Sequence, residues 1–138
     1  MELRIGELSQ QTGCKVVTIR YYEKEGLLPE PSRDASNYRR YDESHVERLH
    51  FIRHCRSLDM TLEETRFLLD LKADAHQSCD EVETLLDTHL LKIEHRVRAL
   101  LSLKEQLLKL RTSCSGEQEI ASCGILRELS TRAETQQA

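Results

Sequence analysis

The chain has 138 residues, of which 4% are aromatic, none is Trp and 32% are charged. This composition argues against a large enzyme core and favours a mainly helical protein packed by Leu, Ile and Val. The net charge of −4 argues against a strongly basic nucleic-acid-binding monomer, but residues 1–56 hold 10 Lys/Arg against 9 Asp/Glu and the acidic excess lies in residues 57–138. DNA binding by the first half therefore stays open, and a dimer with two basic faces fits better than a monomer.

The sequence also bears on the compartment. It has neither an N-terminal apolar run nor an apolar stretch of about 18 residues, so we expect no signal peptide and no membrane span. We therefore expect a cytoplasmic protein. Its five cysteines, an odd number, are then expected to be reduced thiols rather than a disulfide framework.

The first elements are two short helices. Residues 5–14 have apolar positions at helical spacing and then a break at Thr12 and Gly13, and a second helix is expected over 16–25. Two short helices joined by a glycine-containing turn are typical of a helix-turn-helix, whose second helix can enter the major groove.

A turn region and two further helices follow. Pro29 and Pro31 break the helical pattern, and the tyrosine alternation in residues 38–41 predicts a short hairpin or wing. Asp42 is expected to cap a helix that runs to about residue 56. Residues 61–64 read Thr-Leu-Glu-Glu, a capping box that opens another helix ending near residue 72.

A long helix is predicted over residues 78–111. Its apolar residues recur at the 4-3 spacing of a coiled-coil seam, and such a stripe is too long for a small domain to cover. We therefore expect a partner helix from a second copy of the chain. Residues 112–116 read as a loop, residues 124–129 as a short apolar turn, and residues 131–138 as a disordered polar tail.

Several motifs resemble the MerR family of transcriptional regulators: Ile5-Gly-Glu-Leu8, Val17-Thr-Ile-Arg-Tyr-Tyr-Glu23, Gly26-Leu-Leu28 and Tyr38-Arg-Arg-Tyr41. The run from His45 to Met60 resembles the lead- and cadmium-responsive branch of that family. The resemblance implies a winged helix-turn-helix DNA-binding domain over 1–75, an antiparallel coiled-coil dimerisation helix over 78–111 and a metal-binding loop with a short helix over 112–130.

The resemblance also implies a mechanism. A homodimer would sit on an operator inside a promoter whose spacer is too long. Upon metal binding it would bend and untwist the double-stranded DNA so that RNA polymerase engages both promoter elements. Such activation costs DNA deformation energy, which protein–DNA contacts must offset.

The DNA contacts are expected on the second helix and in the wing. Arg20 can contact guanine or phosphate, and three hydroxyls accompany it, those of Thr18, Tyr21 and Tyr22. Either tyrosine could instead be buried beneath the helix. In the wing, Arg39 and Tyr41 are expected to contact phosphate. Three other arginines are expected to be solvated or ordinary surface residues, namely Arg40, Arg53 and Arg56.

Three cysteines are expected to bind metal. Cys79 falls at the predicted first position of the long helix, after Ser78, where a helix N-terminus favours thiolate. Cys114 and Cys123 flank a loop at the far end of that helix. In the antiparallel dimer that the resemblance implies, Cys79 of one protomer would lie beside the other two cysteines of its partner, so the site would exist only in the dimer.

Three thiolates without an obvious fourth ligand favour soft ions, whereas structural zinc usually takes four ligands. Pb(II) is the expected effector because residues 114–126 resemble a lead-sensor loop, and Hg(II), Cd(II) and Zn(II) remain alternatives. His76 could add a ligand or be solvated. Cys14 and Cys55 have apolar neighbours, so we expect them in the core.

Two rival functions remain. Cys114 and Cys123 could form a disulfide in a redox-sensing regulator. The chain could also be a metal-storing or detoxifying protein, but the sequence offers no nucleophile–base pair, phosphate loop or HExxH motif, so we expect no enzyme.

Overall fold

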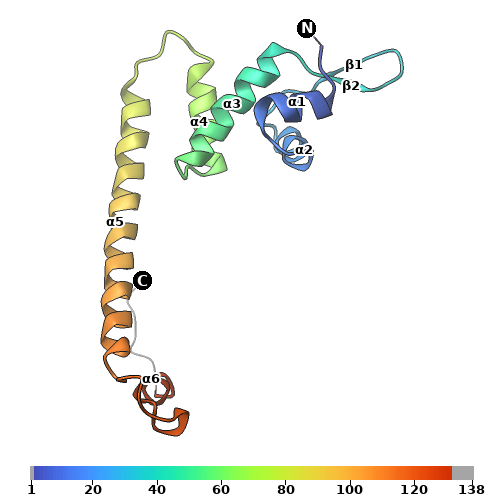
Figure 1. Ribbon diagram of the computed structural model, residues 1–138. Coiled ribbons are helices and arrows are strands. Elements are labelled where there is room, and N and C mark those ends of the chain that lie inside the picture. Colours follow the sequence, from blue (N-terminus) through green and yellow to red (C-terminus); the bar gives the residue numbers. More distant parts are fainter. Residues whose placement is uncertain (1, 132–138) are drawn as a thin grey trace. The chain divides into compact units, whose positions relative to one another are not determined.

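The computed structural model describes residues 2–131, and all but the first residue of the predicted disordered tail lies outside them. The chain divides into two compact units with the boundary between Leu85 and Leu86 (Figure 1). The boundary falls inside the long helix. The predicted domain ranges 1–75, 78–111 and 112–130 therefore stay a prediction.

The first unit opens with the expected helix pair, α1 (Ile5–Thr12) and α2 (Val16–Lys24). Gly13 ends α1 with φ of 75°, a left-handed conformation that glycine adopts without strain. A Cβ at this position would also collide with the Arg53 guanidinium, which donates a hydrogen bond to the Thr12 carbonyl. The turn between the two helices therefore requires glycine.

The predicted wing is a two-stranded antiparallel hairpin. Strand β1 (Ser32–Arg33) pairs with β2 (Arg39–Arg40). A further bridge joins Leu3 to Tyr41, whose backbone amides each donate to the other's carbonyl at 2.7 and 2.8 Å. The base of the wing is thereby tied to the residues that precede α1.

Both predicted helix caps are confirmed. α3 (Glu43–Ser57) begins after Asp42, whose side chain accepts from the Ser44 and His45 amides. α4 (Leu62–Lys72) begins after Thr61, which forms the expected capping box with Glu64.

One apolar core joins these elements. Leu8 of α1, Ile19 of α2 and Leu49 of α3 are fully buried. The rest of the cluster consists of Leu3, Cys14, Tyr22, Leu27, Leu28, Tyr41, Val46, Ile52 and Leu69. This core fixes the faces that α2 and the wing present to solvent.

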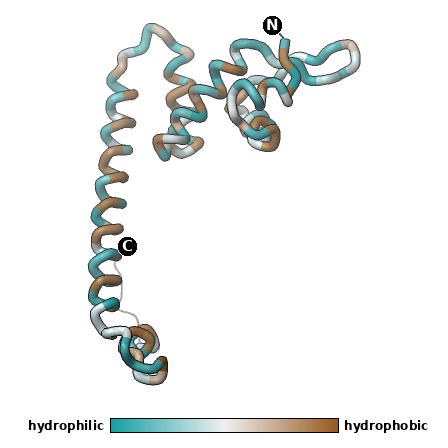
Figure 2. The backbone as a smooth tube through the Cα atoms, viewed as in Figure 1, coloured by the Kyte–Doolittle hydropathy of each residue, from teal (hydrophilic) through white to brown (hydrophobic). Residues whose placement is uncertain are grey.

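The long helix α5 (Asp80–Arg111) has 32 residues, about 48 Å at 1.5 Å per residue. Apolar residues recur along it (Figure 2), and its large hydrophobic side chains are exposed, including Leu90, Val97, Leu100 and Leu107. Within the described residues no helix is long and apolar enough to cross a membrane.

A short 3-10 helix, η1 (Ile120–Ser122), and a six-residue helix, α6 (Gly124–Leu129), follow α5. The apolar turn expected at 124–129 is this short helix, which the resemblance implied within 112–130.

Candidate functional site

The exposed face of α2 carries the first candidate site. Ile19 and Tyr22 of this helix are buried, whereas Arg20 and Lys24 are exposed, and Val17 and Tyr21 are 77% and 46% exposed. These four solvent-facing residues follow the i, i+3, i+4, i+7 spacing that places side chains on one side of a helix. Val17 and Lys24 were not predicted from the sequence to lie on this face, although the position of Ile19 on the same helix could have indicated that Val17 points outward.

The predicted α2 contacts divide into two groups. Arg20 and Tyr21 lie on the exposed face and Thr18 is half-buried. Tyr22 is only 7% exposed, and burial raises the pKa of its hydroxyl. The alternative of burial beneath the helix is therefore confirmed for Tyr22, and the expected DNA contact through it is wrong.

Tyr41 is likewise misassigned as a phosphate contact. Its side chain is fully buried, and its hydroxyl donates a hydrogen bond to Glu23 of α2. Burial and this hydrogen bond raise its pKa. Tyr41 is therefore a core residue at the base of the wing, with its backbone paired to that of Leu3.

Arg39 remains available at the base of the wing. Its Nε lies 3.6 Å from Glu23 Oε2, and its side chain is half-exposed. Glu23 thus contacts two residues of the wing, Arg39 and Tyr41, and connects the wing to α2. This role of Glu23 was not predicted from the sequence.

The wing is further ordered by Asp34. Its carboxylate accepts from the amides of Ser36 and Tyr38 and from Arg40, at 2.9, 3.0 and 2.9 Å. The hydrogen bond from the Tyr38 amide is the main reason that the pKa of Asp34 is lowered. The expectation that Arg40 is simply solvated is therefore wrong, because it holds the hairpin together.

The arginines of α3 also serve the fold. Arg53 and Arg56 are exposed, as expected of surface residues, and they also donate to backbone carbonyls, those of Thr12 and Met60. Arg48 donates to the Leu27 carbonyl at 2.6 Å.

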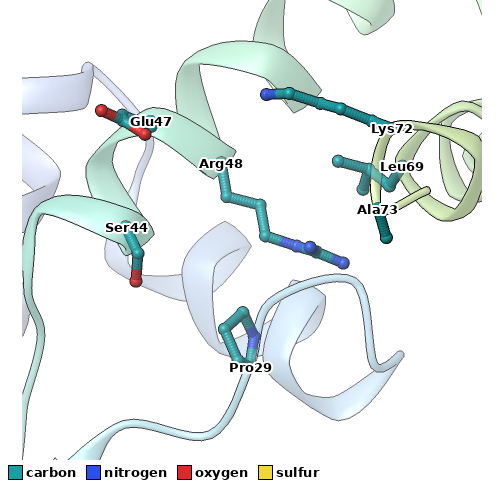
Figure 3. Close-up of a pocket in the computed structure, with 7 residues that line it drawn as sticks. All are labelled: Pro29, Ser44, Glu47, Arg48, Leu69, Lys72 and Ala73. Carbon is teal, nitrogen blue, oxygen red and sulfur yellow. The ribbon is translucent and has the colours of Figure 1, made fainter. Parts of the chain in front are cut away.

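Arg48 reaches across a cavity of about 280 Å³, shown in Figure 3 with Pro29 on one side and, on the other, Leu69 of α4 and Ala73, which follows that helix. Lys72 lines the same cavity, with its ammonium 4.9 Å from the centre of the Phe51 ring. The side chains that line this cavity show no arrangement that suggests catalysis.

Cys114 and Cys123 form the second candidate site. Each is half-buried, and the two side chains lie close enough for Cys114 to lower the pKa of Cys123. The Cys114 thiol donates to Gln118 Oε1 at 3.1 Å, and the Gly116 amide donates to its sulfur at 3.4 Å. The structure therefore brings together two of the three predicted ligands.

Cys123 occupies the N-cap position of α6. Its pKa is lowered, most by the backbone N–H of Leu126, and further by Ile125 and Cys114, while desolvation opposes them. A Cβ added at Gly124 would collide with the Ser113 carbonyl oxygen. Glycine at 124 thus permits the close approach that places the two thiols together.

Cys79 is exposed and lies one residue before α5, so the expectation that it is the first residue of this helix is wrong. Its carbonyl accepts from the Glu83 amide, and the Ser78 hydroxyl accepts from the Asp80 amide. Among residues 2–131 no group of three or more His, Cys, Asp and Glu could hold a metal ion.

The remaining candidates are placed as follows. Cys14 and Cys55 are buried, as predicted, and burial raises the pKa of each. His76 is exposed in the segment before α5, and its role as a ligand stays untested.

Two family descriptions match the chain: "MerR HTH family regulatory protein" over residues 3–72 and "MerR, DNA binding" over residues 46–110. The HTH-type transcriptional regulator ZntR homolog of Haemophilus influenzae is 42% identical over 79% of this chain and 81% of its own length. The mercuric resistance operon regulatory protein of Bacillus cereus is 34% identical, over 94% and 98% of the two chains.

Solved structures agree. The transcription regulator PbrR691 from Ralstonia metallidurans CH34, in complex with lead(II), matches with a TM-score of 0.84 and 46% identity, covering 93% of this chain and 99% of its own. The Bacillus megaterium MB1 regulator MerR, in complex with mercury(II), has a TM-score of 0.73 and 29% identity, with 94% and 100% covered. The helix-turn-helix, the wing, the long helix and these relatives together show that the chain belongs to the MerR family and is a metal-responsive, DNA-binding transcriptional regulator.

Proposed function

We propose that the protein is a homodimer that binds promoter DNA and activates transcription when Pb(II) binds a site shared between protomers. The site would comprise Cys79 of one protomer and Cys114 and Cys123 of its partner. The observation that carries this proposal is the arrangement of the thiols: two meet beside α6, whereas Cys79 lies at the other end of the 32-residue α5.

The dimer is supported by α5. Its exposed apolar residues lie at the spacing of a coiled-coil seam, and an apolar stripe of this length is stabilised when a second helix covers it. If the partner helix runs antiparallel, the start of each α5 lies beside the end of the other. That arrangement would place Cys79 next to the partner's thiol pair.

The choice of a soft ion is supported by the donor set. The thiols of Cys114 and Cys123 are already adjacent, and the lowered pKa of Cys123 favours the thiolate that metal binding requires. When bound, the ion would cross-link three thiolates. Pb(II) is favoured by the likeness to the lead(II)-bound regulator, while Hg(II), Cd(II) and Zn(II) are the alternatives that other relatives support.

The DNA-binding residues are assigned from exposure. Arg20 and Tyr21 would enter the major groove from α2, Thr18 would contribute at the edge, and Arg39 would approach phosphate from the wing. The dimer would then bend and untwist the promoter so that RNA polymerase reaches both of its elements. Promoter DNA lies in the bacterial cytoplasm, which also keeps thiols reduced.

A competitive metal titration tests the proposal. Sulfur-to-metal charge-transfer absorption would be followed for Pb(II), Hg(II), Cd(II) and Zn(II) with the reduced protein, with Cys79→Ser and with Cys55→Ala as the matched control at a buried cysteine. We expect one Pb(II) per shared site, bound more tightly than Cd(II) and Zn(II), with loss of the site only in Cys79→Ser. Tighter Cd(II) or Hg(II) binding would reject lead as effector, and an unaffected Cys79→Ser would reject the shared site.

A redox-sensing regulator is the second candidate, favoured by the contact between Cys114 and Cys123. Peroxide would oxidise the two thiols to a disulfide and be reduced to water. Thiol counting separates the two functions. Loss of two reactive thiols at low peroxide, with no protection by metal, would support redox sensing, whereas protection of three thiols by Pb(II) supports the metal site.

A further inference from the structure

Val17 is the most exposed large hydrophobic residue described in the first unit, at 77%. Single exposed apolar side chains are common on protein surfaces and by themselves mean little. The position of Val17 is what matters. It is the second residue of α2, the helix whose exposed face carries Arg20 and Tyr21.

The geometry of α2 places Val17 within that face. Arg20 and Tyr21 follow it by three and four residues and Lys24 by seven, so all four side chains are neighbours on one side of the helix. Ile19 and Tyr22 occupy the opposite, buried side. Val17 is therefore surrounded by groups suited to DNA and contributes nothing to the core.

The chemistry of the major groove suggests what Val17 contacts. In a helix-turn-helix the N-terminal residues of the second helix reach the base edges. Thymine alone presents a methyl group there, and apolar side chains read it by contact. Because a β-branched side chain in a helix has one strongly preferred rotamer, the methyl groups of Val17 are held in place before DNA arrives.

We propose that Val17 is a specificity-determining residue that reads the C5-methyl group of a thymine in each half-site of the operator. The inference rests on the proposed binding of promoter DNA through α2 and adds a base preference to it. Arg20 and Lys24 supply charge to the same face, whereas Val17 supplies the apolar contact that distinguishes thymine from cytosine and from uracil.

The test uses the full-length dimer and a duplex that it selects from a random-sequence pool. Each thymine of the selected site is replaced in turn, symmetrically in both half-sites, by deoxyuridine, which lacks only the methyl group. Wild type is compared with Val17→Ala, and with Lys24→Ala as a control on the same face. Binding is measured at one fixed salt concentration, because phosphate contacts make affinity depend on salt.

We expect one thymine position at which deoxyuridine weakens wild-type binding by about fourfold per half-site, the factor for one methyl group withdrawn from water. Val17→Ala should bind the thymine duplex more weakly and lose its sensitivity at that position alone. Lys24→Ala should bind every duplex more weakly and keep the wild-type sensitivity.

Three results would overturn the inference. Wild type could be insensitive to deoxyuridine at every position, a result that does not depend on whether any variant folds. Val17→Ala could retain the full wild-type sensitivity, or could bind all duplexes as wild type does. If the protein selects no sequence at all, the proposed function fails as well, whereas a selected duplex without coupling to Val17 rejects only the inference.

Discussion

Tyr41→Phe tests how the wing is attached to α2. The Tyr41 ring is fully buried and its hydroxyl donates to Glu23, whose side chain is only 11% exposed. The substitution keeps the ring and removes one hydrogen bond to a largely desolvated carboxylate. Hydrogen bonds to charged groups contribute about 1.5–3 kcal/mol, so we expect the free energy of unfolding to fall by about 2 kcal/mol.

Urea unfolding of the full-length protein at a fixed protomer concentration is the assay, because dimer stability depends on concentration. Tyr38→Phe is the matched control. Its side chain is 61% exposed, so loss of its hydroxyl should change stability by less than about 0.5 kcal/mol. An equal effect of the two substitutions would refute the view that the Tyr41–Glu23 contact holds the wing.

Tyr41→Phe should also change how the unfolding free energy depends on pH above pH 10. The pKa of Tyr41 is raised above its ordinary value of 10.0, chiefly by burial and then by Glu23. The folded state therefore holds this proton more tightly than the unfolded state does. Its contribution is present below pH 10 and is lost as pH rises towards the folded-state pKa. Tyr41→Phe should lose less stability than wild type above pH 10, and parallel curves would contradict this.

Three further predictions concern the other local contacts. Thr61→Ala removes the side chain that caps α4 and should lower the unfolding free energy by about 1 kcal/mol in urea, while Thr61→Ser should not. Gly124→Ala should weaken Pb(II) binding at least about tenfold, because the added methyl group meets the Ser113 carbonyl. Gly6→Ala, at an open position, is the control. Equal Pb(II) affinities of the two variants would reject the packing argument. The pKa of Asp42 is lowered to about 2, mainly by the Ser44 hydroxyl. The contribution of the ionised Asp42 to stability should therefore be complete above its ordinary pKa of 3.8 and vanish as pH falls through 2. The difference in unfolding free energy between wild type and Asp42→Asn should shrink on acidification.

Local signals explain why most elements could be predicted from the sequence. Asp42 and Thr61 each precede a helix that their side chains cap, so the starts of α3 and α4 are encoded within four residues. Gly13 likewise marks the turn of the helix pair. The short α6 lies within 112–130, where the family resemblance implied a short helix, although six residues give too little periodicity to tell a helix from a turn by pattern alone.

The errors concern contacts between distant residues. Tyr41 was assigned to DNA because its residue type suits phosphate, but its partners, Leu3 and Glu23, lie 38 and 18 positions away in the sequence. Nothing local reveals such pairing. Val17 was passed over because an apolar residue on a helix is ordinarily assigned to the core.

The metal site was predicted only in part from residue types. The three cysteines could be named because they lie among polar neighbours, unlike Cys14 and Cys55. The contact between Cys114 and Cys123 depends on the fold of the loop between them and on the close packing at Gly124, which spacing alone does not specify.

The most direct test of the shared metal site is a mixed dimer. One protomer carries Cys79→Ser, and the other carries Cys114→Ser and Cys123→Ser. In a shared site, the intact Cys79 of the second protomer faces the intact thiol pair of the first, so the mixed dimer has one complete site although neither homodimer has any. We predict one Pb(II) per mixed dimer with the wild-type charge-transfer band. If the mixed dimer gives only the weak absorption of the Cys79→Ser homodimer, the three thiolates do not come from two protomers in this way.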